Sequence, residues 1–183
     1  MRIVGGDWRG RRLVAPPGQA TRPTADRVRQ ALFDMLLHAP WGGRATIEGA
    51  TVLDAFAGTG ALGLEALSRG AGHATFVEHD HAARAALGAN IAHCRAAERS
   101  TVLAEDVLRI RAGMPFTLVF FDPPYGRDLV APAVARLRAI ERIRPGALIV
   151  AETGPDDEPL QPIEVLAERR HGAAKLTIWR EGA

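Results

Sequence analysis

The chain has 183 residues, 47% of them hydrophobic, which is enough to bury one core and too little for two ordinary domains. No stretch approaches the roughly 18 apolar residues of a membrane span, and the amino terminus has no secretory pattern, so we expect a soluble, intracellular and cytoplasmic protein. The single cysteine, Cys94, excludes an internal disulfide.

The charge is unevenly distributed along the chain. Residues 1–29 contain seven arginines and two aspartates, a local charge of +5, so the remaining residues contribute −3 to the net charge of +2. A basic amino-terminal arm on a mildly acidic body indicates a polyanionic partner. The arginines that we expect to contact nucleic-acid phosphates are Arg9, Arg11, Arg12, Arg22, Arg27 and Arg29. Trp8 could stack on a base or pack internally, and a solvated or internally paired arginine surface is the alternative.

The first part of the chain predicts an arm and a helix. Residues 1–24 are rich in Gly, Arg and Pro and are expected to form a basic arm or a short hairpin. Thr24 is a candidate N-cap for a helix over residues 25–37. The predicted buried stripe of this helix, at i, i+3, i+4, i+7 and i+8, consists of Val28, Ala31, Leu32, Met35 and Leu36. The predicted outward side contains Arg27, Arg29 and Gln30.

Residues 51–183 alternate between strand-like and helix-like stretches, which is typical of βαβ units and a mainly parallel sheet. Strands are predicted at 51–56, 74–78, 101–105, 116–121 and 147–152. Helices are predicted from the glycine-rich turn at 57–60 to about 69, from an N-cap at Asp80 to about 97, and from about 129 to 140. The last two strands, 163–170 and 174–180, are joined so closely that they must form an antiparallel hairpin. We therefore expect one α/β domain over residues 1–183.

A glycine-rich turn follows the first predicted strand. Gly58-Thr59-Gly60-Ala61-Leu62-Gly63 is a G-x-G-x-x-G pattern between a strand and a helix, where glycine lets a ligand approach the main chain. Glu78 ends the second strand, where a carboxylate can accept hydrogen bonds from both hydroxyls of a ribose. A dinucleotide and S-adenosylmethionine both satisfy this geometry, and a plain tight turn is the simplest alternative.

Two further acids favour S-adenosylmethionine. Asp54 lies four residues before Gly58, where a carboxylate is a poor neighbour for a pyrophosphate and a suitable one for the ammonium group of a methionine moiety. Asp106, just past the third strand, is placed to accept a hydrogen bond from an adenine amino group. Solvated strand ends are the alternative interpretation of both acids.

The most specific motif is Asp122-Pro123-Pro124-Tyr125-Gly126, at the end of the fourth strand, where ligands bind in open α/β sheets. Each proline forces the residue before it into extended backbone and has no N–H, so the segment offers hydrogen-bond acceptors. An exocyclic amino group of a base is a donor whose lone pair is delocalised into the ring. Accepting its protons at Asp122 and at the Pro123 carbonyl would stabilise the charge that develops during attack on a sulfonium methyl. Tyr125 is suited to stack on the extruded base.

These blocks resemble, in order and over nearly the whole chain, the RsmD-type ribosomal RNA guanine-N2 methyltransferases. The similar segments are IVGGDWRGRRL (3–13), TRPTADRVRQALFDML (21–36), LDAFAGTGALGLEALSRGA (53–71), FVE (76–78) and DPPY (122–125). The resemblance implies a class I methyltransferase fold, Rossmann-like, with a mainly parallel seven-stranded sheet, a carboxy-terminal antiparallel hairpin and a core at 51–183 that binds S-adenosylmethionine. It also implies methylation of a guanine N2 in 16S rRNA, either as naked rRNA or in the 30S particle, with Asp122 to Tyr125 gripping the base. The residues that it implies around the cofactor are Gly58, Gly60, Glu78 and Asp106. The family often has Phe where Tyr125 stands, and either ring can stack.

Other functions are left open by the residues themselves. An amino-methyltransferase of this kind could act on DNA adenine or protein glutamine. A non-catalytic RNA-binding or ribosome-assembly module would use only the basic arm, and a nicotinamide-dependent oxidoreductase would leave the DPPY segment without a role. Cys94 lies in an Ala-rich helical stretch and is expected to pack internally, which argues against a cysteine-nucleophile methyltransferase. His79 and His81 have no neighbours at metal-ligand spacing, so we expect no metal site.

Overall fold

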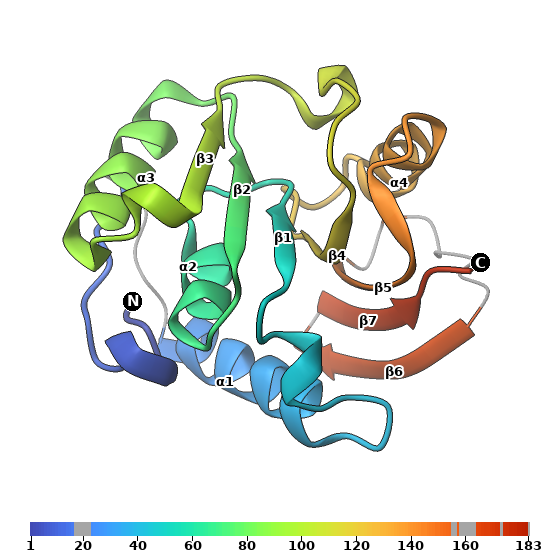
Figure 1. The fold of residues 1–183 in the computed structure, drawn as a ribbon, viewed down its shortest axis with the longest axis horizontal. Helices are drawn as coiled ribbons and strands as arrows, with labels where there is room; N and C mark the ends of the chain where they lie inside the picture. The colour runs from blue at the N-terminus through green and yellow to red at the C-terminus, as the bar shows by residue number, and fades with distance from the viewer. Residues whose placement is uncertain (17–22, 155–156, 158–163, 173, 183) are drawn as a thin grey trace.

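The structure, a computed structural model, describes residues 1–16, 23–154, 157, 164–172 and 174–182. Within these residues, seven strands form one sheet in the order β3-β2-β1-β4-β5-β7-β6 (Figure 1). The strands are β1 (Thr51–Asp54), β2 (His73–Val77), β3 (Ser100–Leu103), β4 (Phe116–Phe121), β5 (Ile143–Thr153), β6 (Glu164–His171) and β7 (Ala174–Arg180). The α-helices are α1 (Pro23–His38), α2 (Ala61–Ser68), α3 (His81–Cys94) and α4 (Val130–Ala139).

The direction of the strands confirms the predicted α/β fold. Strands β1 to β5 pair in parallel, whereas β7 is antiparallel to both β5 and β6. The two last strands form the predicted hairpin at one end of the sheet, drawn in red in Figure 1. Because β1 to β5 all run the same way, their carboxyl ends meet at one edge, which is where ligands bind in such sheets.

The sheet is covered on both faces, as the apolar strand β4 predicts. Leu118 and Phe120 belong to a hydrophobic cluster with α1 and α2, while Val119 and Phe121 belong to a second cluster with α4. This alternation follows from the two-residue period of a strand, and it explains why a doubly covered strand is a nearly continuous apolar run. Helix α1 meets the sheet through Phe33, whose ring centroid lies 5.7 Å from that of Phe120.

The predicted buried stripe of the first helix was right in part. Among residues 26–38, Leu32 and Leu36 are buried as predicted, whereas Ala31 is exposed and Arg29 and Phe33 are buried instead. Helix α1 also begins at Pro23, so Thr24 lies inside it and is not the N-cap. Proline suits the first turn of a helix because its φ is already helical and its missing N–H would have no intrahelical partner.

The amino-terminal arm packs against the body. Ile3, Trp8 and Leu13 are buried in the cluster that contains α1 and α2. An antiparallel bridge between Arg2 and Arg12 closes the arm into a short hairpin-like loop. These contacts bring the arm over the helices of one sheet face, so its position is determined by packing.

Several other boundaries differ from the predictions. Strand β1 ends at Asp54 and not at residue 56, because the chain turns there into the glycine-rich loop. Helix α3 ends at Cys94 and not near residue 97, since Arg95 adopts a left-handed φ of 56° that stops a helix. Cys94 is buried as expected. In the part of the chain that the structure describes, no helix is both long and apolar enough to span a membrane.

Candidate active site

Acidic side chains lie at the carboxyl ends of four strands. Asp54 ends β1, Glu78 follows β2, Asp122 follows β4, and Glu152 is the penultimate residue of β5. Three of the four strands, β1, β4 and β5, are adjacent, and β2 lies on the other side of β1. The parallel sheet therefore gathers these side chains at one edge, on both sides of the position where the glycine-rich loop leaves β1.

The strand register places three of these acids on the same face of the sheet. Asp54 pairs with Phe120, and Phe120 pairs with Val150. Asp122 and Glu152 are each two residues farther along, and two residues is one full strand period. With the register extended to these residues, the three carboxylates lie on the sheet face that α1 and α2 cover.

The glycine-rich loop is held in place by Glu78. The Gly58 N–H donates to Glu78 Oε2 at 2.8 Å, and Glu78 Oε1 accepts from the Asp80 N–H at 2.8 Å. Two main-chain donors thus orient the carboxylate, which has about four acceptor positions when ionised. Glu78 therefore keeps capacity for further donors, such as the two hydroxyls of a ribose.

The loop conformation favours glycine at two positions. Gly58 and Gly60 have φ values of +52° and +79°, which side chains rarely adopt. A Cβ at Gly60 would lie 2.4 Å from Leu87 Cδ1, whereas a Cβ at Gly58 would meet no atom within 4 Å. Gly60 therefore allows close packing, while Gly58 leaves open space beside the main chain for a ligand.

The third glycine of the motif serves packing and orients Asp54. A Cβ at Gly63 would lie 2.3 Å from Phe76 Cε1, so only glycine lets α2 approach the sheet this closely. The Gly63 N–H donates to Asp54 Oδ2 at 3.0 Å. Asp54 is only 1% exposed, and its pKa is raised to about 7 by burial and by the charge of Glu78, against the opposing hydrogen bond from Gly63.

The surroundings of Asp54 suit a cationic ligand. Among the described residues, no lysine, arginine or histidine forms an ion pair with Asp54 or Asp122. A buried carboxylate without a partner cation is costly to ionise, and a bound cation would remove that cost. An ammonium or sulfonium group therefore fits this edge, and a pyrophosphate does not.

Asn90, which the sequence reasoning missed, joins the loop to the arm. Its Nδ2 donates to the Thr59 carbonyl at 2.9 Å and to the Val14 carbonyl at 2.9 Å, and its Oδ1 accepts from the Val14 N–H at 2.7 Å. Asn90 is fully buried in α3. A polar residue in an Ala-rich helix was the available signal, but its partners are 31 and 76 residues away.

Asp106 lies at the same edge of the sheet, beyond β3. Its Oδ1 accepts from the Leu108 N–H at 2.9 Å and caps a short 3-10 helix over Val107–Arg109. The Asp106 side chain is exposed. It is available to a ligand, and its second oxygen has no hydrogen-bond partner among the described residues.

The DPPY segment presents an acceptor and a ring. The Asp122 side chain is exposed, and its pKa is raised to about 7 by loss of solvation and then by the charges of Glu152 and Asp54. Pro123 is buried, which anchors the segment. The Tyr125 side chain is 51% exposed, and its hydroxyl donates to Glu152 Oε1. The ring is thus accessible while its polar end is fixed.

The segment after DPPY is held by Asp157, a second residue that the sequence reasoning missed. Asp157 Oδ1 accepts from the Gly126 N–H at 2.9 Å, and Oδ2 accepts from the Gly154 N–H. These main-chain donors, Gly154 foremost, lower the pKa of Asp157. A Cβ at Gly154 would lie 3.0 Å from Tyr125 Cβ, so this connection packs directly against the ring.

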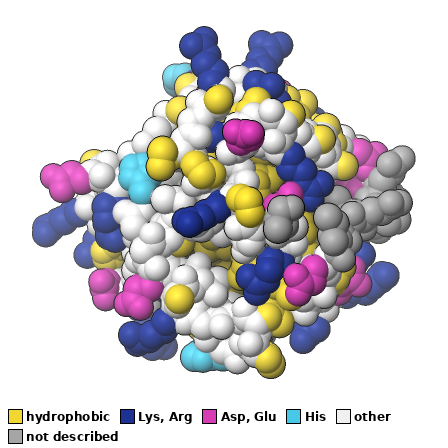
Figure 2. Space-filling view, turned by 45° about the vertical axis from the view of Figure 1, so that its right-hand side comes forward, with side chains coloured by type: hydrophobic (Ala, Val, Ile, Leu, Met, Phe, Trp, Pro, Cys, Tyr) yellow, Lys and Arg dark blue, Asp and Glu magenta, His cyan; other side chains and the backbone are white. Residues whose placement is uncertain are grey.

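The arginines predicted to bind phosphates differ in their exposure to solvent. Arg9, Arg12 and Arg27 are exposed, whereas Arg11 is half-buried and donates to the His93 carbonyl at 3.0 Å. Arg22 lies outside the described residues. Basic and acidic side chains are both scattered over the face shown in Figure 2. Trp8 is a packing residue, because it is buried in the hydrophobic core and the guanidinium groups of Arg11 and Arg99 lie over its ring.

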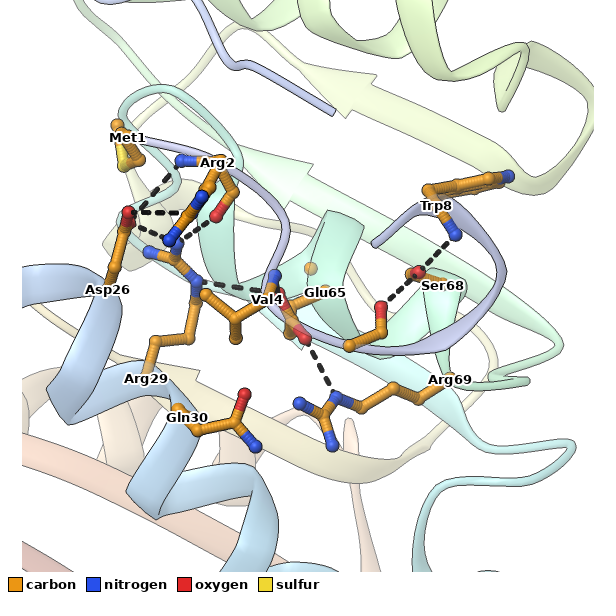
Figure 3. A network of polar contacts seen from close by, with 12 residues as sticks. Met1, Arg2, Val4, Trp8, Asp26, Arg29, Gln30, Glu65, Ser68 and Arg69 are labelled. Carbon is orange, nitrogen blue, oxygen red and sulfur yellow. Dashed lines mark hydrogen bonds and ion pairs between the residues drawn. The ribbon is translucent and has the colours of Figure 1, made fainter. Parts of the chain in front are cut away.

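The expected outward position of Arg29 was wrong. Its side chain is 5% exposed and forms ion pairs with Asp26 at 2.8 Å and with Glu65 at 3.5 Å (Figure 3). Glu65, fully buried in α2, also pairs with Arg69 at 2.8 Å and accepts from the Val4 N–H at 2.8 Å. The buried charge of Glu65 draws Arg29 inward, so this arginine fastens the arm and α1 to α2.

Comparisons with known proteins agree over most of the chain. The model of a family described as "Conserved hypothetical protein 95" matches residues 1–180. "Ribosomal RNA small subunit methyltransferase D" of Escherichia coli K12 is 42% identical over 154 residues, covering 84% of this chain and 74% of that protein. The Haemophilus influenzae protein of the same name is 36% identical over 187 residues, covering 98% and 93%.

Solved structures extend the similarity to the fold. The structure of the Escherichia coli protein yhhF has a TM-score of 0.86 at 36% identity, covering 100% of this chain and 98% of that one. The rRNA methyltransferase aviRa from Streptomyces viridochromogenes has a TM-score of 0.67 at 19% identity, covering 92% and 88%. At that identity the similarity concerns the fold alone.

Proposed function

The chain belongs to the conserved hypothetical protein 95 family, which includes the small-subunit ribosomal RNA methyltransferases D, and we propose that it methylates the exocyclic N2 of a guanine in 16S rRNA. The methyl donor in this proposal is S-adenosylmethionine. One observation supports it above the others: the glycine-rich loop held by Glu78 and the acceptor segment at Asp122 lie at the same edge of one sheet. A class I methyltransferase needs both parts. The loop would bind the methyl donor, and the acceptor segment would bind the amino group that is methylated.

The residues around the loop suit S-adenosylmethionine, which when bound supplies an electrophilic methyl group on a positively charged sulfur. The main chain at Gly58, which has open space beside it, would face the ligand, and we place Thr59 and Gly60 of the same turn around it. Glu78 would accept from the ribose hydroxyls, and Asp54 would pair with the ammonium group. We assign Asp106 to the adenine amino group, because it is exposed at the carboxyl edge beyond β3.

Asp122 and Pro123 would bind the amino group of the base. The Asp122 carboxylate and the Pro123 carbonyl accept its two N–H donors, which localises the nitrogen lone pair and stabilises the charge that develops during attack. A strong base is unnecessary, because the alkylated nitrogen is acidic enough to lose its proton. Pro124 keeps the segment extended and free of competing donors.

Tyr125 would stack on the extruded base. Its ring is half exposed, and its hydroxyl is fixed by Glu152, so the stacking surface is oriented before the base arrives. Such a contact contributes about 1–3 kcal/mol to binding and tolerates any base. Stacking therefore supports capture of a base and does not select it.

The exposed arginines support RNA as the polymer. Arg9, Arg12 and Arg27 project from the arm and from α1, on the sheet face that Asp122 and Glu152 share. Arg11 could add a contact, and Arg22 is part of the same basic stretch of sequence. Arg29 is withdrawn from this set because it is buried. Small-subunit rRNA, naked or assembled into the 30S particle, is the proposed partner.

The experiment is a methyl-transfer assay with nucleoside analysis. Purified protein and labelled S-adenosylmethionine are incubated with 16S rRNA and with 30S particles from cells that lack this gene. We expect labelled N2-methylguanosine, and we expect Asp122→Ala to abolish transfer while calorimetry still detects cofactor binding. Label in DNA adenine or protein glutamine would overturn the substrate, and absence of cofactor binding would favour a non-catalytic RNA-binding protein.

A further inference from the structure

Glu152 occupies the position next to Asp122 at the edge of the sheet. The last paired residues of β4 and β5 before this edge are Phe121 and Ala151, so Asp122 and Glu152 are the next residues on two neighbouring strands. Parallel strands lie about 4.8 Å apart. The two carboxylates interact, since Glu152 is among the causes that raise the pKa of Asp122, after the loss of solvation.

Glu152 lies on the side of Asp122 that is away from the glycine-rich loop. The sheet order runs from β2 and β1, which hold the loop, to β4 and then to β5. A base whose amino group lies at Asp122 would therefore extend the rest of its edge toward Glu152. The side chain that the base meets there is an acceptor when ionised.

A contact with Tyr125 orients Glu152. The Tyr125 hydroxyl donates to Glu152 Oε1, and Tyr125 itself is packed against Gly154. The segment after the ring is tied to Asp157 through the Gly126 N–H at 2.9 Å. Among the described residues, Oε2 of Glu152 has no hydrogen-bond partner, so this oxygen can accept from a substrate.

The edges of the bases differ at the position beside the amino group. In guanine, the N2 amino group is next to the N1–H, so three hydrogens lie in a row. In adenine and cytosine, the ring nitrogen beside the amino group is an acceptor. An acceptor placed one strand beyond Asp122 can therefore bind the N1–H of guanine. In adenine and cytosine it would face another acceptor, which is unfavourable.

We propose that Glu152 selects guanine by accepting the N1–H of the base while Asp122 and the Pro123 carbonyl hold its N2 amino group. This inference rests on the proposed function and adds a residue that determines specificity. A site built to bind a substrate N–H rejects an analogue that lacks it, because the acceptor is left without a partner. The expected discrimination is roughly 10-fold to 100-fold.

The test uses 2-aminopurine, which keeps the exocyclic amino group and has an acceptor at N1. Once the methylated nucleotide has been mapped, 16S rRNA with guanine or 2-aminopurine at that position is assembled into 30S particles, and kcat/KM is measured for each. Wild type should prefer guanine by about 10-fold or more. Glu152→Gln, whose amide can donate to N1, should reduce this preference by about 10-fold, losing activity on guanine and gaining activity on 2-aminopurine.

Two further variants keep the test decisive. Glu152→Ala removes the acceptor without supplying a donor, so it should lose activity on guanine and should not lower activity on 2-aminopurine. Glu168→Gln, an exposed glutamate of β6 that pairs with Lys175, is the control and should keep the wild-type preference. Calorimetry with S-adenosylmethionine should give the same affinity for every variant.

The outcomes separate this inference from the proposed function. If wild type transfers no methyl group to guanine-containing particles, the proposed function fails. If wild type methylates guanine but Glu152→Gln and Glu152→Ala keep the wild-type preference, Glu152 does not select the base and only this inference fails.

Discussion

The Asn90 amide hydrogen bonds to both main-chain groups of Val14, accepting from its N–H at 2.7 Å and donating to its carbonyl at 2.9 Å. The second amide hydrogen binds the Thr59 carbonyl at 2.9 Å. One buried side chain thus connects the arm, helix α3 and the glycine-rich loop. The basic arm and the proposed cofactor loop are mechanically linked through it.

Substitution of Asn90 should therefore weaken both the arm and the loop. We expect Asn90→Ala to lower the free energy of unfolding by about 2–3 kcal/mol, because it removes the partner of the buried Thr59 carbonyl and of two half-buried main-chain groups of Val14. Asn90→Asp should be worse, since an ionised carboxylate has no donor for the two carbonyls. Urea unfolding and calorimetry with S-adenosylmethionine measure the two effects. Unchanged cofactor affinity in Asn90→Ala would show that the link does not reach the loop.

Arg29 and Arg27 should have opposite roles although they are two residues apart. Arg29→Ala removes a cation from the buried Glu65, so we expect the free energy of unfolding to fall by about 2–4 kcal/mol. Arg27→Ala removes an exposed charge, so stability should change by less than about 0.5 kcal/mol while affinity for 16S rRNA decreases. Chemical denaturation and filter binding at two salt concentrations test the pair. Equal loss of stability in both variants would contradict the different burial.

The rate of methyl transfer should increase with pH through the titration of Asp122. Its pKa is raised to about 7, mainly by loss of solvation and then by Glu152 and Asp54. The ionised form accepts the amino hydrogens, whereas the protonated form presents a donor to a donor, so activity should fall as the pH drops below about 7. Values of kcat/KM, obtained from initial rates between about pH 5.5 and about pH 8.5, give this profile. Asp122→Asn is the control, because its side chain does not titrate. A flat wild-type profile would remove Asp122 from this role.

Asp54 should destabilise the ligand-free protein at alkaline pH. Its folded-state pKa of about 7 lies above the ordinary value of 3.8, so the folded protein binds this proton more tightly than the unfolded chain does. The contribution of this proton to the free energy of unfolding is fully present below about pH 4, and it is lost as the pH rises through about 7. Asp54→Asn keeps an acceptor for the Gly63 N–H, so at pH 8 it should raise the free energy of unfolding by about 1–3 kcal/mol.

The same substitution should weaken the binding of the cationic ligand. Asp54→Asn removes the negative charge that we assign to the ammonium group, so calorimetry should detect lower affinity for S-adenosylmethionine. Binding should also release protons near neutral pH in wild type, because a cation favours ionised Asp54. Titrations in buffers with different ionisation enthalpies measure that release. Tighter binding by the variant would reverse the assignment.

The buried side of the first helix could not be predicted fully from the sequence. The apolar spacing in residues 25–37 allowed two nearly equivalent stripes, and the side that contained Arg29 looked outward because arginine is charged. The structure buries Arg29, since Glu65 of α2 lies opposite it. A charged residue can be buried only when a partner lies opposite, and that partner is 36 residues away.

The sequence by itself determined the α/β order, the glycine-rich loop and the DPPY segment, because these depend on local periodicity, on φ angles that favour glycine and on the missing N–H of proline. Only the tertiary structure decided that Asn90 joins the arm to the loop and that Glu152 lies beside Asp122. Those relationships are set by the register of the strands and by packing between segments far apart in the chain. Neither is encoded in the spacing of neighbouring residues.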